Sequence, residues 1–341
     1  MSLFEVELVS QWLRQQFQKP VSHHFKILSI FRFFSLFQDI EDKSKYISYY
    51  LQFKDDILSL ILKDQFEYCT LEEIDALKSI VDYIISFSPS INQHEKEKLF
   101  DMLESARKRI LSILNDEPAI NVEVNSDDAF SINQVLIEND CNSKINSGII
   151  EKLSIDIHKN GMPEIPDSIT FENNYDDNET DLPVHLKKIM LLAKNEAEKI
   201  SNQNKTYKLT LSFAKKDSLY SGTSMGLGAA ALVYNSILRD HLHNIYYRFR
   251  NNVVVGSAID EQGNLIALEA EPLKLKLKTV FYSSYKKFVI PEENIIDARK
   301  FLKELKDKYP NRKLELIPIR HYLALFKNLD IVEVCKLKLK E

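Results

Sequence analysis

The chain has 341 residues, of which 44% are hydrophobic, and a formal net charge of -5. This length can bury a sizeable core and predicts two domains, whereas the weak negative charge argues against a nucleic-acid partner. The three cysteines form no CxxC pair, which argues against a disulfide framework and a zinc site, so no metal or cofactor is expected. The sequence shows no signal peptide and no apolar stretch of about 20 residues, so we expect a cytoplasmic protein with no membrane partner.

Residues 1–117 are predicted to form an all-helical module. Apolar residues recur every three or four positions over 71–85 and again over 99–114, which is typical of amphipathic helices. Thr70 and Glu73 have the spacing of a capping box at the start of the first of these helices. Earlier helices are expected over 3–18, 22–38 and 42–63.

Residues 118–182 are rich in aspartate and asparagine, and we expect them to be a connecting region with a few short strands, one of them over 152–158. From residue 183 onwards, predicted helices and strands alternate, which is typical of a mixed α/β domain. The expected helices cover 184–200, 224–238 and 294–309, and the expected strands cover 207–213, 253–259, 264–268, 287–290 and 314–317. The predicted fold class is therefore α/β (α+β), with the mixed domain over 183–341.

Glycine is concentrated in one part of the chain, because five of the seven glycines lie between 222 and 263. There, the segment SGTSMGLGAAALV (221–233) places Ser224 where a loop enters a predicted helix. The N–H groups and positive potential of a helix N-terminus can stabilise an oxyanion beside a serine hydroxyl. Two other interpretations remain open: a serine N-cap beside a packed glycine loop, and a phosphate-binding loop at Gly226–Gly228 similar to that of GHMP-type small-molecule kinases.

Three segments, in the right order, resemble the proteolytic domain of the Lon protease family. The segment FAKKDSLYSGTSMG (213–226) matches without a gap the family's strand, loop and catalytic serine, where the usual pattern ends DGPSAG. The segment LKLKLKTVFYSSYKKFVIPEEN (273–294) is similar to the family's lysine segment, which runs GGLKEK, then a helix, then a strand ending IPxxN. The segment LELIPIRH (314–321) is similar to the next strand. The resemblance covers about residues 183–330.

The resemblance implies a Ser-Lys dyad, with Ser224 as nucleophile and, in the gapless register that reaches Pro291, Lys274 as general base. A serine hydroxyl needs such a base, and a lysine serves only when it is neutral, so its pKa must be lowered by burial. Lys274 lies between apolar neighbours, and we therefore expect it to be partly buried in a helix. Lys276 lies about 200° away around a helix axis, so only one of the two lysines can face Ser224.

The residues around the serine both support the resemblance and depart from it. We expect loop or oxyanion support from Gly222, Thr223, Met225 and Gly226. Thr223 replaces the family's usual proline, Met225 its usual alanine and Ser221 its usual aspartate. Val255 stands where the family has a threonine that helps to hold the lysine. These departures keep open a non-catalytic interaction module with the same fold.

The implied function is that of a serine endopeptidase acting on a protein substrate without a cofactor. The nucleotide-binding pattern GxxxxGK[ST] does not occur in this chain, so we expect activity that needs no ATP. A separate unfoldase or activating partner would then dock on residues 1–117. The alternatives are the non-catalytic Lon-fold module and the small-molecule kinase.

Overall fold

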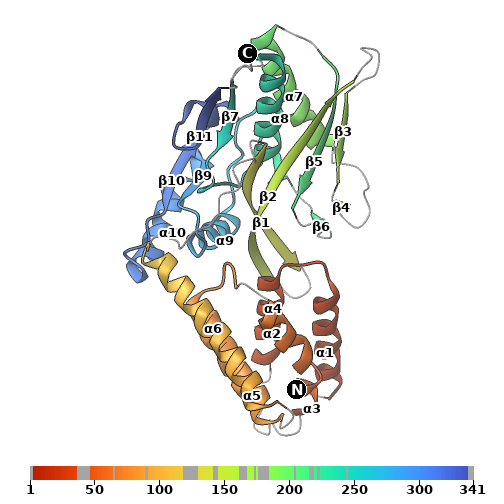
Figure 1. Ribbon diagram of the computed structural model, residues 1–341, viewed down its shortest axis with the longest axis vertical. Helices are drawn as coiled ribbons and strands as arrows, with labels where there is room; N and C mark the ends of the chain where they lie inside the picture. Colours follow the sequence, from red (N-terminus) through yellow and green to blue (C-terminus); the bar gives the residue numbers. More distant parts are fainter. Residues whose placement is uncertain are drawn as a thin grey trace. The chain divides into compact units, whose positions relative to one another are not determined.

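A computed structural model gives the fold of the chain (Figure 1). It describes residues 3–36, 47–63, 66–88, 91–117, 130–140, 145–160, 167–172, 174–175, 184–202, 205–214, 219–220, 223–242 and 245–336. The chain divides into two compact units. The first comprises Met1–Ala119 together with Glu138–Ser147, and the second comprises Ile120–Ile137 together with Gly148–Glu341.

The first unit is helical in the part that the structure describes. Its helices are α1 (Leu3–Gln18), α2 (His23–Ser35), α3 (Ile47–Leu51), α4 (Lys54–Lys63), α5 (Leu71–Ser86) and α6 (Gln93–Leu114). The helices predicted over 3–18, 71–85 and 99–114 are therefore confirmed. The single helix expected over 42–63 is wrong, because two helices, α3 and α4, occupy 47–63, and 42–46 lie outside the described residues.

Two helices of this unit begin at capping boxes. The Thr70 hydroxyl accepts the Glu73 N–H at 3.1 Å, and the Glu73 carboxylate accepts the Thr70 N–H at 2.8 Å. Asn92 and Glu95 repeat this arrangement at the start of α6. Each box satisfies N–H groups that the first turn of a helix leaves without an intrahelical partner. The capping box predicted at Thr70 is confirmed.

The second unit is built on a seven-stranded sheet with the order β10-β9-β8-β1-β2-β5-β3. The strands are β1 (Ser131–Asp140), β2 (Ile145–Lys159), β3 (Ser168–Phe171), β5 (Tyr207–Phe213), β8 (Val253–Val255), β9 (Lys287–Pro291) and β10 (Glu315–Ile319). Strands β10, β9, β8 and β1 pair in parallel, as do β5 and β3, whereas β2 and β5 are antiparallel. The expected mixed α/β class is therefore confirmed.

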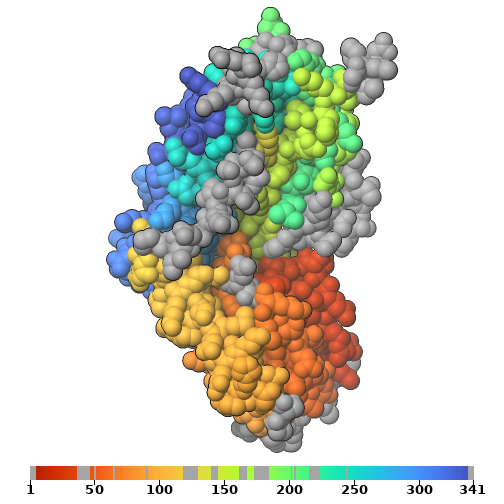
Figure 2. All heavy atoms as spheres, in the orientation of Figure 1, coloured from red at the N-terminus to blue at the C-terminus, as the bar shows by residue number. Residues whose placement is uncertain are grey.

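Two smaller pairs of strands complete the second unit. Strand β11 (Val332–Lys336) runs antiparallel to β7 (Ile245–Phe249), and β4 (Asn174–Tyr175) runs parallel to β6 (Leu219–Tyr220). Strand β11 lies at the surface of this unit, in dark blue in Figure 2, and its Val334 is 45% exposed.

The described helices of this unit are α7 (Val184–Ser201), α8 (Gly226–Leu242), α9 (Ala270–Phe281) and α10 (Ile295–Lys308), with short 3-10 turns at Glu292–Asn294 and Tyr322–Lys327. Helix α8 packs along α7, as Figure 1 shows, and is buried over nearly its whole length. A helix that is apolar all round is suited to such a central place. Gly228 permits close packing on the sheet, because a Cβ there would lie 2.5 Å from Gln134 Oε1 of β1.

The central part of the sheet departs from the sequence-based expectation. Residues 118–182, expected to be a connecting region with a few short strands, supply β1, β2 and β3, and β1 and β2 occupy inner positions of the sheet. The strand expected over 152–158 is confirmed as part of β2. The strand expected over 253–259 ends at Val255, and the one over 264–268 forms only isolated bridges. The reason is local, since Ser257 O bonds to Leu227 of α8, and Ala258 and Asp260 bond to residues 264–266 of their own turn. Among the described residues, no helix has the length and apolar character needed to cross a bilayer.

Candidate functional site

Ser224 lies in the turn that leads into helix α8 and is half-buried. Its carbonyl accepts a short hydrogen bond from the side-chain amide of Gln134 on β1. The Gly226 N–H donates to Thr223 O at 3.0 Å, and the Ala229 N–H donates to Met225 O at 2.9 Å. The turn is therefore fixed both to its own helix and to the sheet. Gly222 lies outside the described residues.

The segment after strand β8 is bound to the first turn of α8. Val255 pairs with Gln134 across the parallel strands, and the chain then passes through Gly256 and Ser257. The Leu227 N–H donates to Ser257 O at 3.1 Å. A Cβ on Gly256 would lie 2.4 Å from the Val135 side chain, so only glycine allows β8 to end this close to β1.

Lys276 reaches the same segment from helix α9. Its side chain is only 1% exposed, and its Nζ donates to Gly256 O at 2.7 Å. Burial lowers the pKa of this amine from 10.5 to about 8, because removal from water disfavours the charged form. No carboxylate forms an ion pair with Lys276 among the residues that the structure describes. A sizeable fraction of this side chain is therefore a neutral amine near pH 8.

Lys274 does not have these properties. Its side chain is exposed, and its Nζ lies 5.7 Å from the centre of the Phe301 ring. The expected partial burial of Lys274 is wrong, although the expected helix around it is confirmed as α9. The reason is the helical rotation of about 200° between positions 274 and 276, which directs Lys276 into the core and Lys274 outwards.

The first turn of α8, which follows Ser224, and the side chain of Lys276 both bond to the segment after β8. Lys276 bonds the carbonyl of Gly256, and the next carbonyl, that of Ser257, is bonded by Leu227 three residues after Ser224. The Ser257 hydroxyl is fully buried and has no hydrogen-bond partner among the described residues. No role for Ser257 is predicted from the sequence. Its hydroxyl is a second polar group, one residue after Gly256, whose carbonyl accepts from Lys276.

A cavity of about 420 Å³ opens beside the serine turn. It is lined by residues of α7, of the serine turn and of the loop that follows Ile259: His185, Ile189, Thr223, Ile259, Gln262 and Ile266. The Nε2 atom of His185 is buried without a partner among the described residues. Cavities of this size and mixed lining are typical of ligand-binding sites.

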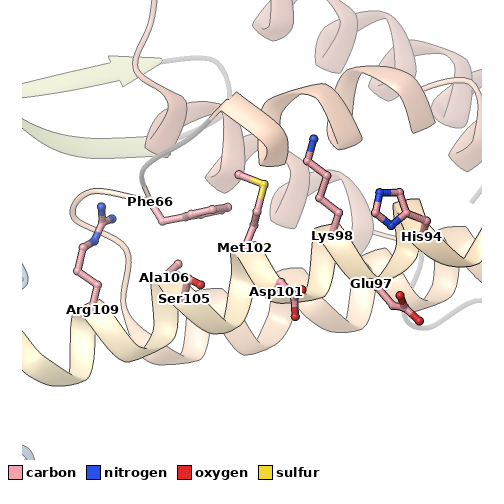
Figure 3. Close-up of a pocket in the computed structure, with 9 residues that line it drawn as sticks. All are labelled: Phe66, His94, Glu97, Lys98, Asp101, Met102, Ser105, Ala106 and Arg109. Atoms are coloured by element: carbon pink, nitrogen blue, oxygen red, sulfur yellow. The ribbon is translucent and has the colours of Figure 1, made fainter.

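A second cavity, of about 620 Å³, lies in the helical unit along α6 (Figure 3). Figure 3 shows Phe66 and Met102 in its middle, with Arg109 towards one end and Lys98 and His94 towards the other. The cavity brings together apolar contacts and several positive groups, but it holds none of the residues predicted for the active site.

The site offers a half-buried serine hydroxyl, which can act as a nucleophile, and a buried amine with a lowered pKa, which can act as a base. The predicted nucleophile, Ser224, lies at the N-terminus of α8 as expected, and the amine with a lowered pKa is that of Lys276. Comparison of the chain with protein-family models and with curated proteins finds no match.

Proposed function

We propose that this chain is a Lon-like serine peptidase that hydrolyses peptide bonds in a protein substrate, with Ser224 as nucleophile and Lys276 as general base. One observation carries the proposal: Lys276 is almost fully buried without an ion pair among the described residues. Burying an unpaired ammonium is expensive, and such groups are concentrated at functional sites. General-base lysines typically have a pKa of about 7–8.

The reaction would proceed in two steps. Neutral Lys276 accepts the proton of the Ser224 hydroxyl as the oxygen attacks the peptide carbonyl. The protonated lysine then donates to the leaving amine, the C–N bond breaks, and an acyl-enzyme forms on Ser224. Water, deprotonated by the same lysine, attacks the acyl carbonyl; the bond between Ser224 Oγ and the acyl carbon breaks, the lysine returns the proton to Oγ, and the acid is released. The N-terminal end of α8 is the source of oxyanion stabilisation, although the Gly226 N–H is already bonded to Thr223 O.

The buried Ser257 hydroxyl supports the lysine in place of the family's threonine. Val255 cannot offer a hydrogen bond through its side chain, whereas Ser257 lies directly after the residue that accepts from Lys276. A hydroxyl without a partner at this place is available to the lysine when the Gly256 bond is released during proton transfer. We assign Ser257 a positioning role.

Labelling by a fluorophosphonate probe tests the dyad without knowledge of the substrate. We expect the wild type to be labelled, Ser224→Ala not to be labelled, and Lys276→Ala to lose at least about 100-fold in rate. Two matched controls are Ser284→Ala and Lys274→Ala, both at exposed positions, which should label normally. Labelling that survives Ser224→Ala, or a folded wild type that is never labelled, would reject the peptidase.

The alternatives make different predictions. A non-catalytic module with this fold would leave Ser224 unreactive in the folded wild type. The small-molecule kinase requires an open glycine loop, but Gly226 and Gly228 are both buried within α8, which argues against a phosphate site there. Saturable ATP binding would nevertheless restore that alternative.

Docking of an unfoldase or activator on residues 1–117 is the second part of the proposal. The cavity along α6 supports it, since exposed charged side chains of both signs surround an apolar middle there, with Arg109 towards one end. Truncation at 117 is a poor test, because residues 138–147 belong to the same unit and would lose their partners. Arg109→Glu, compared with Lys108→Glu outside the cavity, is the sharper test of substrate delivery in a cell lysate.

A further inference from the structure

Three side chains that can ligate a metal converge in the helical unit. His24, at the start of α2, meets Cys69 and Glu73, which lie just before and within the first turn of α5. One imidazole nitrogen, the thiol sulfur and one carboxylate oxygen all lie within 4.8 Å of one another. The sequence gives no hint of this, because His24 lies far from the other two residues along the chain and the cysteine has no CxxC partner.

The spacing of these atoms suits a tetrahedral ion. His24 Nε2 lies 3.2 Å from Glu73 Oε2. Two ligands bound to Zn²⁺ at about 2.0–2.1 Å are separated by about 3.4 Å along a tetrahedral edge. His24 and Cys69 are 7% and 1% exposed, so the site is shielded from bulk water. Small inward movements of the three side chains would therefore complete the ligand triangle.

A second set of contacts orients these side chains. The other ring nitrogen of His24, Nδ1, lies 2.9 Å from the Ser147 hydroxyl at the start of β2. With a metal bound, Nδ1 would carry the proton and donate it to Ser147, and the Nε2 lone pair would be available to the ion. Glu73 is held in turn by the Thr70 N–H at 2.8 Å. Such outer hydrogen bonds are typical of metal-binding histidines and carboxylates.

The backbone before Cys69 is unusual in a way that points to the same place. Phe66 and Tyr68 have φ values of 53° and 67°, in the left-handed region that bulky residues rarely adopt. Strained backbone persists where surrounding interactions over-determine it, commonly at ligand sites. Here the strain precedes the cysteine by one to three residues.

We propose that His24, Cys69 and Glu73 form a Zn²⁺ site with water as the fourth ligand. Thiolate and imidazole ligands favour zinc over magnesium or calcium, which prefer oxygen ligands. Binding would release the thiol proton of Cys69 to solvent. The imidazole proton would move from Nε2, where it is donated to Glu73, to Nδ1, where it is donated to Ser147, so that Nε2 and Glu73 each bond the metal in place of their hydrogen bond. The ion would join the N-termini of α2 and α5, and through Ser147 the end of the β1–β2 ribbon that belongs to this unit. This site is independent of the proposed peptidase activity.

Titration of the full-length protein with Co²⁺ tests the site, because a cobalt–thiolate bond gives a charge-transfer absorption band. We expect one equivalent of Co²⁺ to produce the band and one equivalent of Zn²⁺ to abolish it. Cys69→Ser should remove the band, whereas Cys335→Ser, in β11 of the other unit, should keep it. Ser147→Ala should retain the band with affinity lowered by about 10- to 100-fold. Circular dichroism without metal verifies that each variant is folded.

Two results would overturn the site. One is a folded wild type that gives no band and whose melting temperature does not rise with Zn²⁺. The other is a band that survives Cys69→Ser, or that is lost instead with Cys335→Ser or Cys141→Ser, since the metal would then bind elsewhere. If Ser147→Ala leaves the affinity unchanged, the proposed orientation of His24 is wrong.

Discussion

Replacing Lys276 by methionine should make the protein more stable at neutral pH. The folded state lowers the pKa of this amine to about 8 from an ordinary value of 10.5. At about 1.36 kcal/mol per pKa unit, holding the charged form in the core costs about 3 kcal/mol below pH 8. Methionine has a similar length and needs no proton, but it leaves Gly256 O without its present donor. We therefore expect a net gain of about 1–3 kcal/mol at pH 7.

The pH dependence gives the same prediction a second readout. Between pH 8 and 10.5 the unfolded chain retains a proton on this lysine that the folded chain has lost. Stability conferred by this residue therefore rises with pH in that window, by up to about 1.4 kcal/mol per pH unit, and is constant below it. Lys276→Met should remove that rise, so the advantage of the variant should shrink towards zero near pH 10.5.

Urea unfolding followed by circular dichroism at several pH values between 7 and 10.5 measures both effects. Lys274→Met is the matched control, because that lysine is exposed and its replacement should change stability by less than about 0.5 kcal/mol. A Lys276→Met variant that is less stable than wild type at pH 7, with an unchanged pH slope, would show that the buried amine is not destabilising. The basis for assigning it the general-base role would then be lost.

The remaining predictions concern reactivity. Ser224→Ala should lose fluorophosphonate labelling and casein cleavage while its circular dichroism spectrum stays native, since the residue lies in a half-buried turn; cleavage equal to wild type would exclude Ser224. The labelling rate of the wild type should increase with pH through about 8, because only the neutral amine of Lys276 accepts the proton. Lys276→Arg should be inactive at every pH tested, because a guanidinium does not deprotonate. Ser257→Ala should slow labelling by about 10-fold and displace the midpoint of the pH dependence of the labelling rate, while its unfolding free energy stays within about 1 kcal/mol of wild type. If the rate and the midpoint are unaltered, Ser257 has no positioning role.

The helical periodicities predicted much of the fold. Helices α1, α5 and α6 follow from apolar spacing and capping residues, and β5 follows from strict alternation over 207–213. Strand β1 was missed because its residues lie in a polar, asparagine-rich part of the chain, and only the sheet reveals that they occupy an inner position. The contact between Gln134 of β1 and Ser224 can therefore be seen only in the structure.

The burial of the two lysines of α9 could be predicted in part from the sequence. Leu273, Leu277 and Val280 define the buried face of α9, and Lys276 follows the first of these by three residues and precedes the last by four. Lys274 is also three residues from Leu277, but at about 100° per residue Lys276 lies nearer the centre of that face. The gapless register with the Lon pattern favours Lys274, whereas this periodicity favours burial of Lys276. The metal-ligand cluster, by contrast, has no local signal, because its members come together only when α2 packs on α5.

The helical unit is discontinuous along the chain, which has a consequence for its synthesis. Ser22, at the start of α2, donates its N–H to Glu138 at 2.7 Å, across 116 positions of sequence. The first six helices leave the ribosome well before this partner and before Ser147, which contacts His24. Until then the starts of α2 and α5 lack part of their native surroundings. The N-terminal unit can therefore be completed only after the β1–β2 ribbon has been made. A nascent chain arrested before residue 138 should be digested more easily by an added protease than a longer nascent chain from which residue 147 has already emerged from the ribosome.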